Sequence, residues 1–306
     1  KRKMKILLTS VGCMGYVGLI KAFQEHKVKV FGVDNSENAV GFSFCDGFSV
    51  IPHGDDENYI PEILKVCQEN KIRAIIPSSD NEILKIGEDR SIFESVGISI
   101  LLPTNRSLEI CNNKSLFYEC LSKWDIPHPE VRDFLDVEFP AVLKPKVGKG
   151  SVGVRTITKI EQLSEGVSDD QLLQDFISGD EYTVDILANE NSTILSMVQR
   201  RRVRIDSGIS IQAEVVEDDE GRLICTELNN RLQMRGMYCV QYIQNKTGIY
   251  VLEVNPRFGG GSVLSLKADP TIILNYLNLL QDKAVEVVCD NPSKIKMKRY
   301  YAEIYE

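Results

Sequence analysis

VQYIQNKTGIYVLEVNPRFGGG, residues Val240–Gly261, is the most informative segment of this chain of 306 residues. Two apolar runs rich in β-branched and aromatic residues, 240–243 and 249–254, flank the turn-like segment Asn245–Gly248. This pattern predicts a β-hairpin. The segment ends in Gly259–Gly261, which would let the backbone approach a ligand closely.

Three oxygen-bearing side chains lie in these strands: Gln241, Glu253 and Asn255. Alternation puts Glu253 and Asn255 on one face of the second strand, and hairpin pairing can bring Gln241 beside them. One carboxylate and two amide oxygens suit Mg²⁺, or Mn²⁺ in its place, with substrate phosphates completing the coordination. Arg257 follows closely and could bind phosphate or carboxylate oxygens through two hydrogen bonds. The alternative is an ordinary hairpin whose Glu and Asn cap a solvated edge.

The run E-V-N-P-R-F-G-G-G behind a glutamine-bearing strand resembles the ATP-grasp superfamily, in particular its carbamoyl-phosphate-synthase-like branch. In that branch the Gln, Glu and Asn hold magnesium ions, so the resemblance implies these roles for Gln241, Glu253 and Asn255. Many ATP-grasp enzymes carry an acidic residue where this chain has Gln241, which narrows the resemblance to this branch. The resemblance covers nearly the whole chain and is most specific from Lys114 to Gly261.

Bulk properties exclude several classes of protein. A net charge of −8 argues against general nucleic-acid binding. No apolar run approaches the roughly 20 residues of a transmembrane helix, and the first residues lead straight into a strand, so we expect a soluble, cytoplasmic protein without membrane partners. Eight scattered cysteines and three histidines make zinc or dithiol sites improbable and predict reduced thiols.

Strands and helices alternate through the first hundred residues, which predicts a doubly wound, Rossmann-like parallel sheet. The pattern includes strands at 4–10 and 28–34 and helices at 59–70 and 82–96. Glycines 12, 15 and 18, followed by Asp34, invite a dinucleotide-binding interpretation, although their spacing departs from G-x-G-x-x-G. That interpretation stays open as a less favoured alternative.

Polar residues at the carboxyl ends of these strands form a candidate ligand-binding rim, because parallel sheets bind ligands there. The rim comprises Ser10, Gly12, Asp34, Ser78, Ser79, Asp80 and Glu82. The resemblance implies that this domain helps to hold the acceptor substrate, with Asp34, Asp80 and Glu82 as candidate contacts. The alternative is that these are ordinary turn and cap residues.

A strand lysine, Lys144, precedes the glycine-rich segment Lys146–Gly153. Free backbone N–H groups in such a loop can bind phosphate oxygens, and lysine adds a mobile positive charge. The lysine precedes the glycines, so this is no Walker loop; a plain hairpin turn is the alternative. The resemblance implies that the loop covers the triphosphate and that Lys114 contacts it. The phosphate-binding residues would be Lys114, Lys144, Gly148, Gly150, Ser151 and Gly153.

The resemblance also assigns the rest of the nucleotide site. Residues 174–177 correspond to the hinge that binds adenine, Glu181 to the ribose-binding glutamate, and Gly208 and Ile209 to the loop that closes over the nucleotide. The contacts implied are Gln174, Asp175, Phe176, Ile177, Glu181, Gly208 and Ile209. Asp185, in the strand after the hinge, is expected to face solvent or substrate.

Three arginines, Arg200, Arg202 and Arg204, alternate along one strand and are predicted to share a face. Guanidinium groups suit carboxylate recognition, so we expect this face to bind the acceptor beside the N-terminal domain. The alternative is that the arginines pair with surface carboxylates.

We therefore predict a Rossmann-like pre-ATP-grasp domain (1–110), a small ATP-grasp lobe (111–185) and a large lobe with the metal site (186–306), an α/β and α+β architecture whose lobes carry antiparallel sheets. The expected activity is that of a carboxylate–amine ligase that uses ATP and Mg²⁺ and forms an acylphosphate, with Lys144 and Arg257 as catalytic residues. The expected partners are small-molecule carboxylates and amines; a homodimer is left open. Rival interpretations are phosphotransfer to bicarbonate or carbamate, as in carbamoyl phosphate synthesis, and an ATP-binding subunit without turnover.

Overall fold

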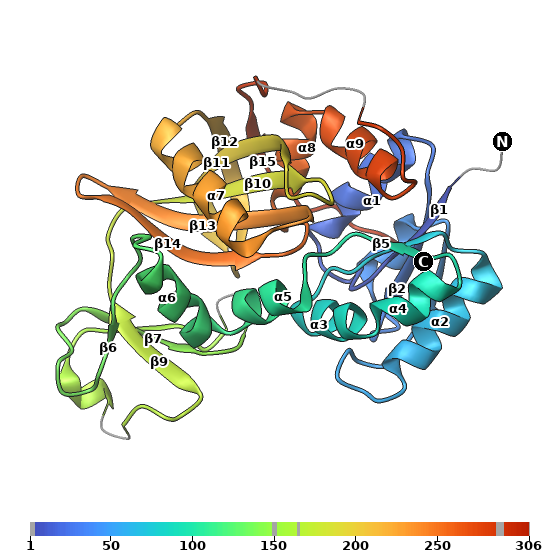
Figure 1. Ribbon diagram of the computed structural model, residues 1–306. Helices are drawn as coiled ribbons and strands as arrows, with labels where there is room; N and C mark the ends of the chain where they lie inside the picture. Colours follow the sequence, from blue (N-terminus) through green and yellow to red (C-terminus); the bar gives the residue numbers. More distant parts are fainter. Residues whose placement is uncertain (1–3, 149–151, 164–165, 286–290, 306) are drawn as a thin grey trace.

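The computed structural model describes residues 4–148, 152–163, 166–285 and 291–305. Its strands form three sheets of five, four and six strands. In Figure 1 the five-stranded sheet lies on the right, the six-stranded sheet at the upper left and the four-stranded sheet at the lower left. The predicted sequence of one parallel sheet followed by two antiparallel sheets is confirmed.

The N-terminal sheet is parallel throughout and has the order β3-β2-β1-β4-β5. Its strands are β1 (Lys5–Leu8), β2 (Lys29–Asp34), β3 (Gly47–Val50), β4 (Ala74–Ile76) and β5 (Ser99–Ile100). Its helices are α1 (Tyr16–Glu25), η1 (Val40–Phe44), α2 (Tyr59–Asn70), α3 (Asp80–Glu88) and α4 (Arg90–Ser95). The single helix predicted for 82–96 is therefore two helices, which meet at Asp89. The doubly wound architecture is as predicted.

The small lobe begins with α5 (Asn105–Asn112) and α6 (Lys114–Lys123). Asn113 starts α6 because its side-chain oxygen accepts a hydrogen bond from the Leu116 N–H at 3.2 Å, a standard N-cap. The antiparallel sheet that follows has the order β6-β9-β7-β8. Its strands are β6 (Val131–Arg132), β7 (Ala141–Pro145), β8 (Arg155–Ile157) and β9 (Gln171–Asp175), with the short helix η2 (Ile160–Leu163) between β8 and β9.

The large lobe is built on an antiparallel sheet with the order β14-β13-β10-β11-β12-β15. Its strands are β10 (Asp180–Ala188), β11 (Ile194–Asp206), β12 (Ile209–Val216), β13 (Gly236–Asn245), β14 (Gly248–Asn255) and β15 (Lys296–Lys298). Its helices are α7 (Asp219–Leu232), α8 (Ser262–Ala268) and α9 (Thr271–Leu279). Because β10 belongs to this sheet, the sheets divide between β9 and β10, and the domain boundary expected at 185 falls too late.

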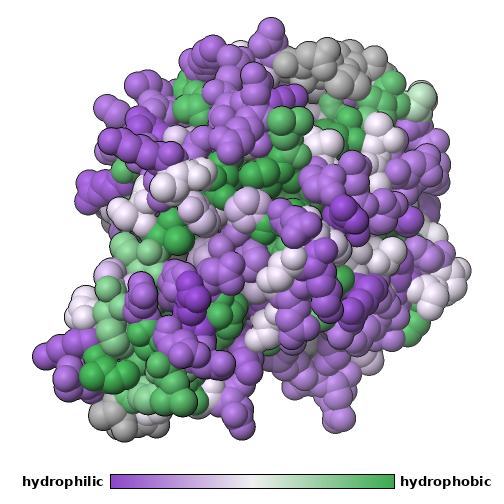
Figure 2. Space-filling view, turned by 60° about the vertical axis from the view of Figure 1, so that its left-hand side comes forward, coloured by the Kyte–Doolittle hydropathy of each residue, from purple (hydrophilic) through white to green (hydrophobic). Residues whose placement is uncertain are grey.

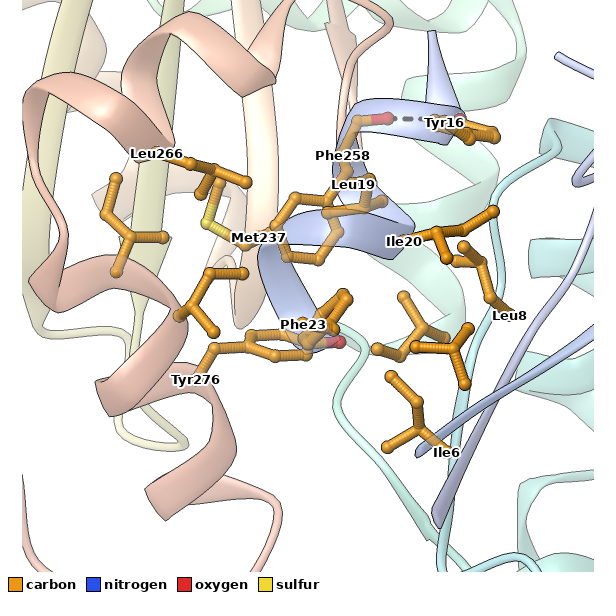
Figure 3. Packing of buried hydrophobic residues seen from close by; sticks show 14 of the residues in the cluster. Ile6, Leu8, Tyr16, Leu19, Ile20, Phe23, Met237, Phe258, Leu266 and Tyr276 are labelled. Atoms are coloured by element: carbon orange, nitrogen blue, oxygen red, sulfur yellow. Dashed lines mark hydrogen bonds between the residues drawn. The ribbon is translucent and has the colours of Figure 1, made fainter. Parts of the chain in front are cut away.

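Aromatic packing joins the N-terminal domain to the large lobe (Figure 3). The ring of Phe23 on α1 meets Phe258 edge to face, with centroids 5.9 Å apart, and Phe258 meets Tyr276 of α9 at 5.2 Å. Tyr16 donates a hydrogen bond to the Phe258 carbonyl at 3.1 Å. Such aromatic pairs add about 0.5–1.5 kcal/mol each beyond their area burial. The packing therefore fixes the end of the hairpin segment against the carboxyl edge of the parallel sheet.

The surface is mainly hydrophilic in the view of Figure 2, and apolar residues gather on the small lobe at the lower left. Exposed apolar side chains of that lobe include Val131, Phe134 and Leu135. In the described part of the chain, none of the helices combines the length and the apolar character needed to cross a membrane.

Candidate active site

A cleft of about 840 Å³ lies among the three units. The N-terminal domain, the small lobe and the large lobe all contribute to its walls. The predicted site residues that line it are Lys114, Lys144, Gly148, Gln174, Asp175, Phe176, Ile177, Glu181, Arg200, Arg202, Gly208, Ile209, Gln241, Glu253 and Arg257. Residues far apart in the sequence are thus brought together, as a substrate site requires.

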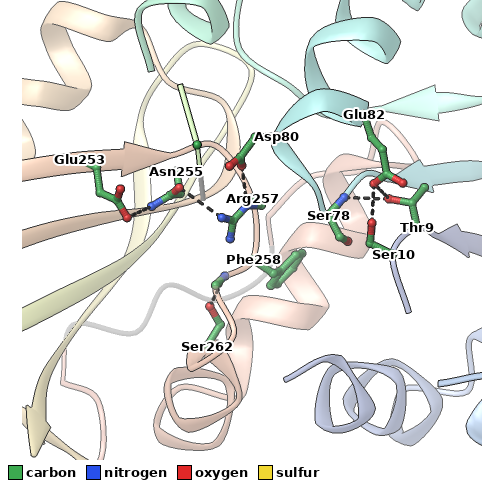
Figure 4. Close-up of polar contacts among 12 residues, drawn as sticks. Thr9, Ser10, Ser78, Asp80, Glu82, Glu253, Asn255, Arg257, Phe258 and Ser262 are labelled. Atoms are coloured by element: carbon green, nitrogen blue, oxygen red, sulfur yellow. Dashed lines mark hydrogen bonds and ion pairs between the residues drawn. The ribbon is translucent and has the colours of Figure 1, made fainter. Parts of the chain in front are cut away.

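The hairpin places the predicted metal ligands side by side. Gln241 of β13 pairs directly with Glu253 of β14, and the register then shifts at a bulge that holds Leu252. Asn255 donates its amide to the Glu253 carboxylate at 2.8 Å (Figure 4). All three side chains offer oxygen atoms, and only one is charged, so the set fits a Mg²⁺ ion that shares nucleotide phosphates. Among the described residues, no cluster of three His, Cys, Asp or Glu side chains offers a rival metal site.

Arg257 connects the metal strand to the N-terminal domain. Its Nε donates to the Asp80 carboxylate at 2.8 Å, and its terminal nitrogen lies 3.3 Å from the Asn255 side-chain oxygen (Figure 4). Both side chains of the Arg257–Asp80 pair are less than one-fifth exposed. Asp80 is the first residue of α3 and belongs to the predicted acceptor rim. Its ion pair with Arg257 therefore holds the Arg257 guanidinium between this rim and the predicted metal site.

Lys144 lies deep in the small-lobe wall and is 8% exposed. Its ammonium donates to the Tyr118 hydroxyl at 2.6 Å and lies 4.7 Å from the centre of that ring. Burial lowers the pKa of Lys144 to about 7, while Glu253 opposes this shift and Lys114 adds to it. Lys114 donates to the Gly148 carbonyl at 2.8 Å, so the predicted helix lysine contacts the glycine-rich segment. The calls for Gly150 and Ser151 lie outside the described residues, and Gly153 adopts φ +75°, a conformation that favours glycine.

The predicted hinge forms the end of β9. Gln174 is 2% exposed, whereas Phe176 is 41% exposed. The Asp175 carboxylate binds Arg132 through two hydrogen bonds of 2.8 and 2.6 Å. Because that pair occupies the Asp175 carboxylate, this side chain is not free to bind the predicted adenine.

Arg202 lines the cleft among the predicted nucleotide contacts. One terminal nitrogen donates to both Glu181 and Gln241 at 3.0 Å, and the other donates to the Gly208 carbonyl at 2.7 Å. Burial lowers the pKa of Arg202, and Glu181 raises it. The guanidinium therefore joins the predicted ribose-binding glutamate, a predicted metal ligand and the closing loop.

The prediction that three arginines share one face is wrong. Arg200 is 1% exposed and forms a buried ion pair of 2.6 Å with Asp185, whereas Arg204 is exposed. The register of β11 against β12 shifts twice around Arg204, so alternation fails there. Asp185 was expected to face solvent or substrate but is 0% exposed and also accepts hydrogen bonds from Ser262 and Ser265.

The N-terminal rim is only partly as predicted. Ser10, Ser78 and Ser79 line the cleft. The Asp34 carboxylate instead accepts a hydrogen bond of 2.7 Å from the backbone N–H of Gly12. A side chain on Gly12 would meet that carboxylate at 2.9 Å, so this glycine makes room for Asp34. The Gly12 N–H and the Asp34 carboxylate, which a dinucleotide would bind, therefore bind each other. This argues against the dinucleotide-binding interpretation.

Glu82 was expected to contact the acceptor, but it is 6% exposed. It accepts hydrogen bonds from Thr9 at 2.6 Å and Ser10 at 3.0 Å (Figure 4). Neither Glu82 nor Asp34 is among the lining residues of the cleft. Both carboxylates hold the ends of the first strands in place.

Two residues that contact lining residues of the cleft carried no sequence signal. Tyr118 is the one tyrosine of the amphipathic helix α6, and Arg299 follows β15 in an isolated basic stretch. Arg299 donates to the carbonyls of Ser210 and Gly260, two residues that line the cleft. The asparagine at the helix start predicts that Tyr118 lies one turn from Lys114. It does not predict that Tyr118 contacts Lys144.

Comparison with known families identifies both parts of the chain. Residues 111–261 match the family described as the ATP-grasp domain, and residues 6–101 match the PylC-like N-terminal domain. The chain therefore belongs to the ATP-grasp enzymes and carries a PylC-like N-terminal domain.

The relatives with named functions have low sequence identity to this chain. The chain is 21% identical to a carbamoyl-phosphate synthase of Methanobrevibacter smithii over 98% of its own length and 85% of that protein's. It is 22% identical to the carbamoyl phosphate synthase large chain of Clostridium botulinum strain Eklund 17B over 79% of its length, but it spans only 24% of that large chain.

Solved structures share the fold. The L-amino acid ligase of Bacillus licheniformis superposes with a TM-score of 0.70 at 17% identity, over 92% of this chain and 75% of that one. The biotin carboxylase domain of Hydrogenobacter thermophilus 2-oxoglutarate carboxylase, solved with MgADP and bicarbonate, gives 0.74 at 13% identity, over 96% and 73%.

Proposed function

We propose that this chain is a carboxylate–amine ligase that binds Mg-ATP between its two ATP-grasp lobes and forms an acylphosphate. The observation that carries the proposal is the Arg257–Asp80 pair. It joins the metal strand to the N-terminal rim, so that one cationic side chain borders both the predicted triphosphate site and the predicted acceptor site.

The nucleotide half of the cleft has the groups that a triphosphate needs. Lys144 and Lys114 supply positive charge from the small lobe, and Glu253 and Asn255 supply oxygen ligands from the large lobe. A Mg²⁺ ion bound there, or Mn²⁺ in its place, would neutralise phosphate charge as the γ-phosphoryl group leaves. Gln241 would complete the protein ligands.

The acceptor half has a different composition. Ser10, Ser78 and Ser79 offer hydroxyl and backbone groups, and Arg257 offers the cation. A carboxylate held against Arg257 would have its charge screened as it approaches the γ-phosphorus. The L-amino acid ligase of Bacillus licheniformis has a similar fold, and this similarity supports a carboxylate as the acceptor substrate.

The reaction proceeds in two displacements. A carboxylate oxygen attacks the γ-phosphorus, and the bond from phosphorus to the β,γ-bridging oxygen breaks, which releases ADP. The amine then attacks the acyl carbon, the carbon–oxygen bond to phosphate breaks, and the amine loses a proton to solvent. One oxygen of the carboxylate thus leaves with the phosphate. Exclusion of water protects the mixed anhydride between the two steps.

Incubation of the purified protein with Mg-ATP and a library of carboxylates and amines, read by mass spectrometry, tests this function. We expect ADP, phosphate and an amide product. With the active carboxylate labelled by ¹⁸O, one labelled oxygen should appear in the phosphate.

Other outcomes contradict the proposal. Product formation that requires bicarbonate would indicate carbamoyl-phosphate chemistry instead. Binding of Mg-ADP without turnover of any acceptor pair would indicate an ATP-binding subunit. Unlabelled phosphate in the ¹⁸O experiment would exclude an acylphosphate.

A further inference from the structure

We propose that Tyr118 is a positioning residue that sets Lys144 of the small lobe against the metal strand of the large lobe. The proposal rests on the proposed function, because it takes Lys144 as a ligand of the nucleotide phosphates. It adds a residue that acts through Lys144 without contacting the nucleotide itself.

A single hydroxyl group makes both contacts. The Tyr118 hydroxyl accepts from the Lys144 ammonium at 2.6 Å and donates to the Leu252 carbonyl at 2.7 Å. These roles use the one proton and a lone pair of the hydroxyl without conflict. Tyr118 packs in a core cluster with large-lobe strands, and Lys144 lies on β7 of the small-lobe sheet, so the hydroxyl links Lys144 to Leu252 of β14 across the two sheets.

The position of Leu252 in β14 connects this contact to the predicted metal ligands. It is the extra residue of the bulge in β14, where the register passes from Gln241–Glu253 to Tyr242–Val251. A bulge frees a backbone carbonyl from the ladder and redirects the neighbouring side chains. Tyr118 takes up this carbonyl, and the next residue along the strand is Glu253, the charged member of the predicted metal set.

The ring of Tyr118 is held firmly. The residue is 2% exposed, and His128 stacks on it with centroids 5.6 Å apart and an angle of 20° between the planes. His128 is itself fixed by contacts of its two ring nitrogens with Ile126 and Ser122 at 2.8 and 3.0 Å. Burial and stacking therefore fix the direction of the hydroxyl.

Lys144 depends on this hydroxyl. The ammonium is buried, and in the described part of the chain no carboxylate forms an ion pair with it. A buried amine without a hydrogen-bond acceptor is costly, so the lysine would otherwise turn away from the cleft. The Tyr118 oxygen and the adjacent ring face hold it in the cleft.

The test compares the binding of Mg-ADP, by calorimetry, in the whole chain and in four variants. Tyr118→Phe keeps the ring and removes the hydroxyl, and we expect the Kd to rise about tenfold. Lys144→Met should weaken binding further. In the Lys144→Met background, Tyr118→Phe should change the Kd by less than about twofold, since additivity fails for residues that act through each other.

The fourth variant is a matched control. Tyr238 is also fully buried and donates its hydroxyl to Asn229 at 2.9 Å, within the core of the large lobe. Tyr238→Phe should lower the melting temperature by an amount similar to that for Tyr118→Phe but leave the Kd unchanged. This comparison separates positioning of Lys144 from general loss of packing.

Two outcomes would overturn the inference: an unchanged Kd in a folded Tyr118→Phe variant, or a full Tyr118→Phe effect in the Lys144→Met background. If Tyr118→Phe does not fold, His128→Leu replaces it, because loss of the stacked ring frees the tyrosine while keeping its hydroxyl. A wild-type chain that binds Mg-ADP but makes no amide would contradict the ligase proposal and leave this inference standing.

Discussion

Arg202 and Glu181 form an ion pair of 3.0 Å in which the arginine side chain is only 8% exposed. Glu181 is the predicted ribose contact, and the same guanidinium nitrogen also binds Gln241. This geometry places Arg202 beside two of the predicted nucleotide-site residues. We therefore propose that Arg202 contributes to nucleotide binding. This role replaces the acceptor-binding role that we expected from the sequence.

Arg202→Met should raise the KM for ATP and the Kd for Mg-ADP by about tenfold or more, because a buried, hydrogen-bonded cation is lost beside the phosphates. The KM for the carboxylate should change little. Steady-state kinetics with each substrate varied in turn provides the measurement.

Arg204→Met is the matched control for this prediction. Arg204 lies two residues along the same strand but is exposed, so its replacement should leave both constants unchanged. A selective rise in the KM for the carboxylate in Arg202→Met would restore the acceptor role.

Local patterns predicted the arrangement of the candidate metal ligands only in part. Strand alternation brings Glu253 and Asn255 to one face, but the register of the two-residue turn alone would place Gln241 opposite Leu252, and only the bulge at Leu252 pairs Gln241 with Glu253. The same rule failed for Arg204, where two register shifts interrupt the alternation. Sequence cannot show where such bulges fall, since they depend on the partner strand. It also could not show that Asp185 would be buried by Arg200.

Glu253→Gln should abolish turnover while the protein stays folded. The substitution preserves shape but removes the only negative charge of the predicted metal set, which a divalent cation needs. Mg²⁺ should then no longer strengthen ADP binding in calorimetric titrations with and without the metal.

Glu227→Gln serves as the control, because Glu227 is an exposed helix residue paired with Arg231. It should behave like the wild type in both assays. Near-normal ATP-dependent activity of Glu253→Gln would disprove the metal assignment.

Mg-ADP should raise the melting temperature, whereas NADH should not. A ligand at a hundredfold excess over its Kd stabilises the folded state by about 2.7 kcal/mol. The Gly12 N–H that a dinucleotide would need already binds Asp34. A thermal shift with NADH and none with Mg-ADP would reverse the assignment of the two domains.

Lys144 should make stability depend on pH in the empty protein. Burial lowers its pKa from 10.5 to about 7, so between these values the unfolded chain binds more protons than the folded one. The free energy of unfolding should therefore rise as the pH increases through this window. In Lys144→Met, urea unfolding at pH 7.5 and 9.5 should show a smaller rise; an identical rise would assign the effect to other groups.

The same lysine predicts that nucleotide binding takes up a proton. At a pH of about 8, above the lowered pKa, most of the empty protein carries a neutral Lys144. Phosphate oxygens favour the charged ammonium and raise its pKa, so Mg-ADP should bind together with nearly one proton. Calorimetry in buffers with different heats of ionisation measures this uptake directly. Lys144→Arg, which stays charged at this pH, should bind Mg-ADP without proton uptake. Equal uptake by both proteins would show that Lys144 is already protonated in the empty cleft.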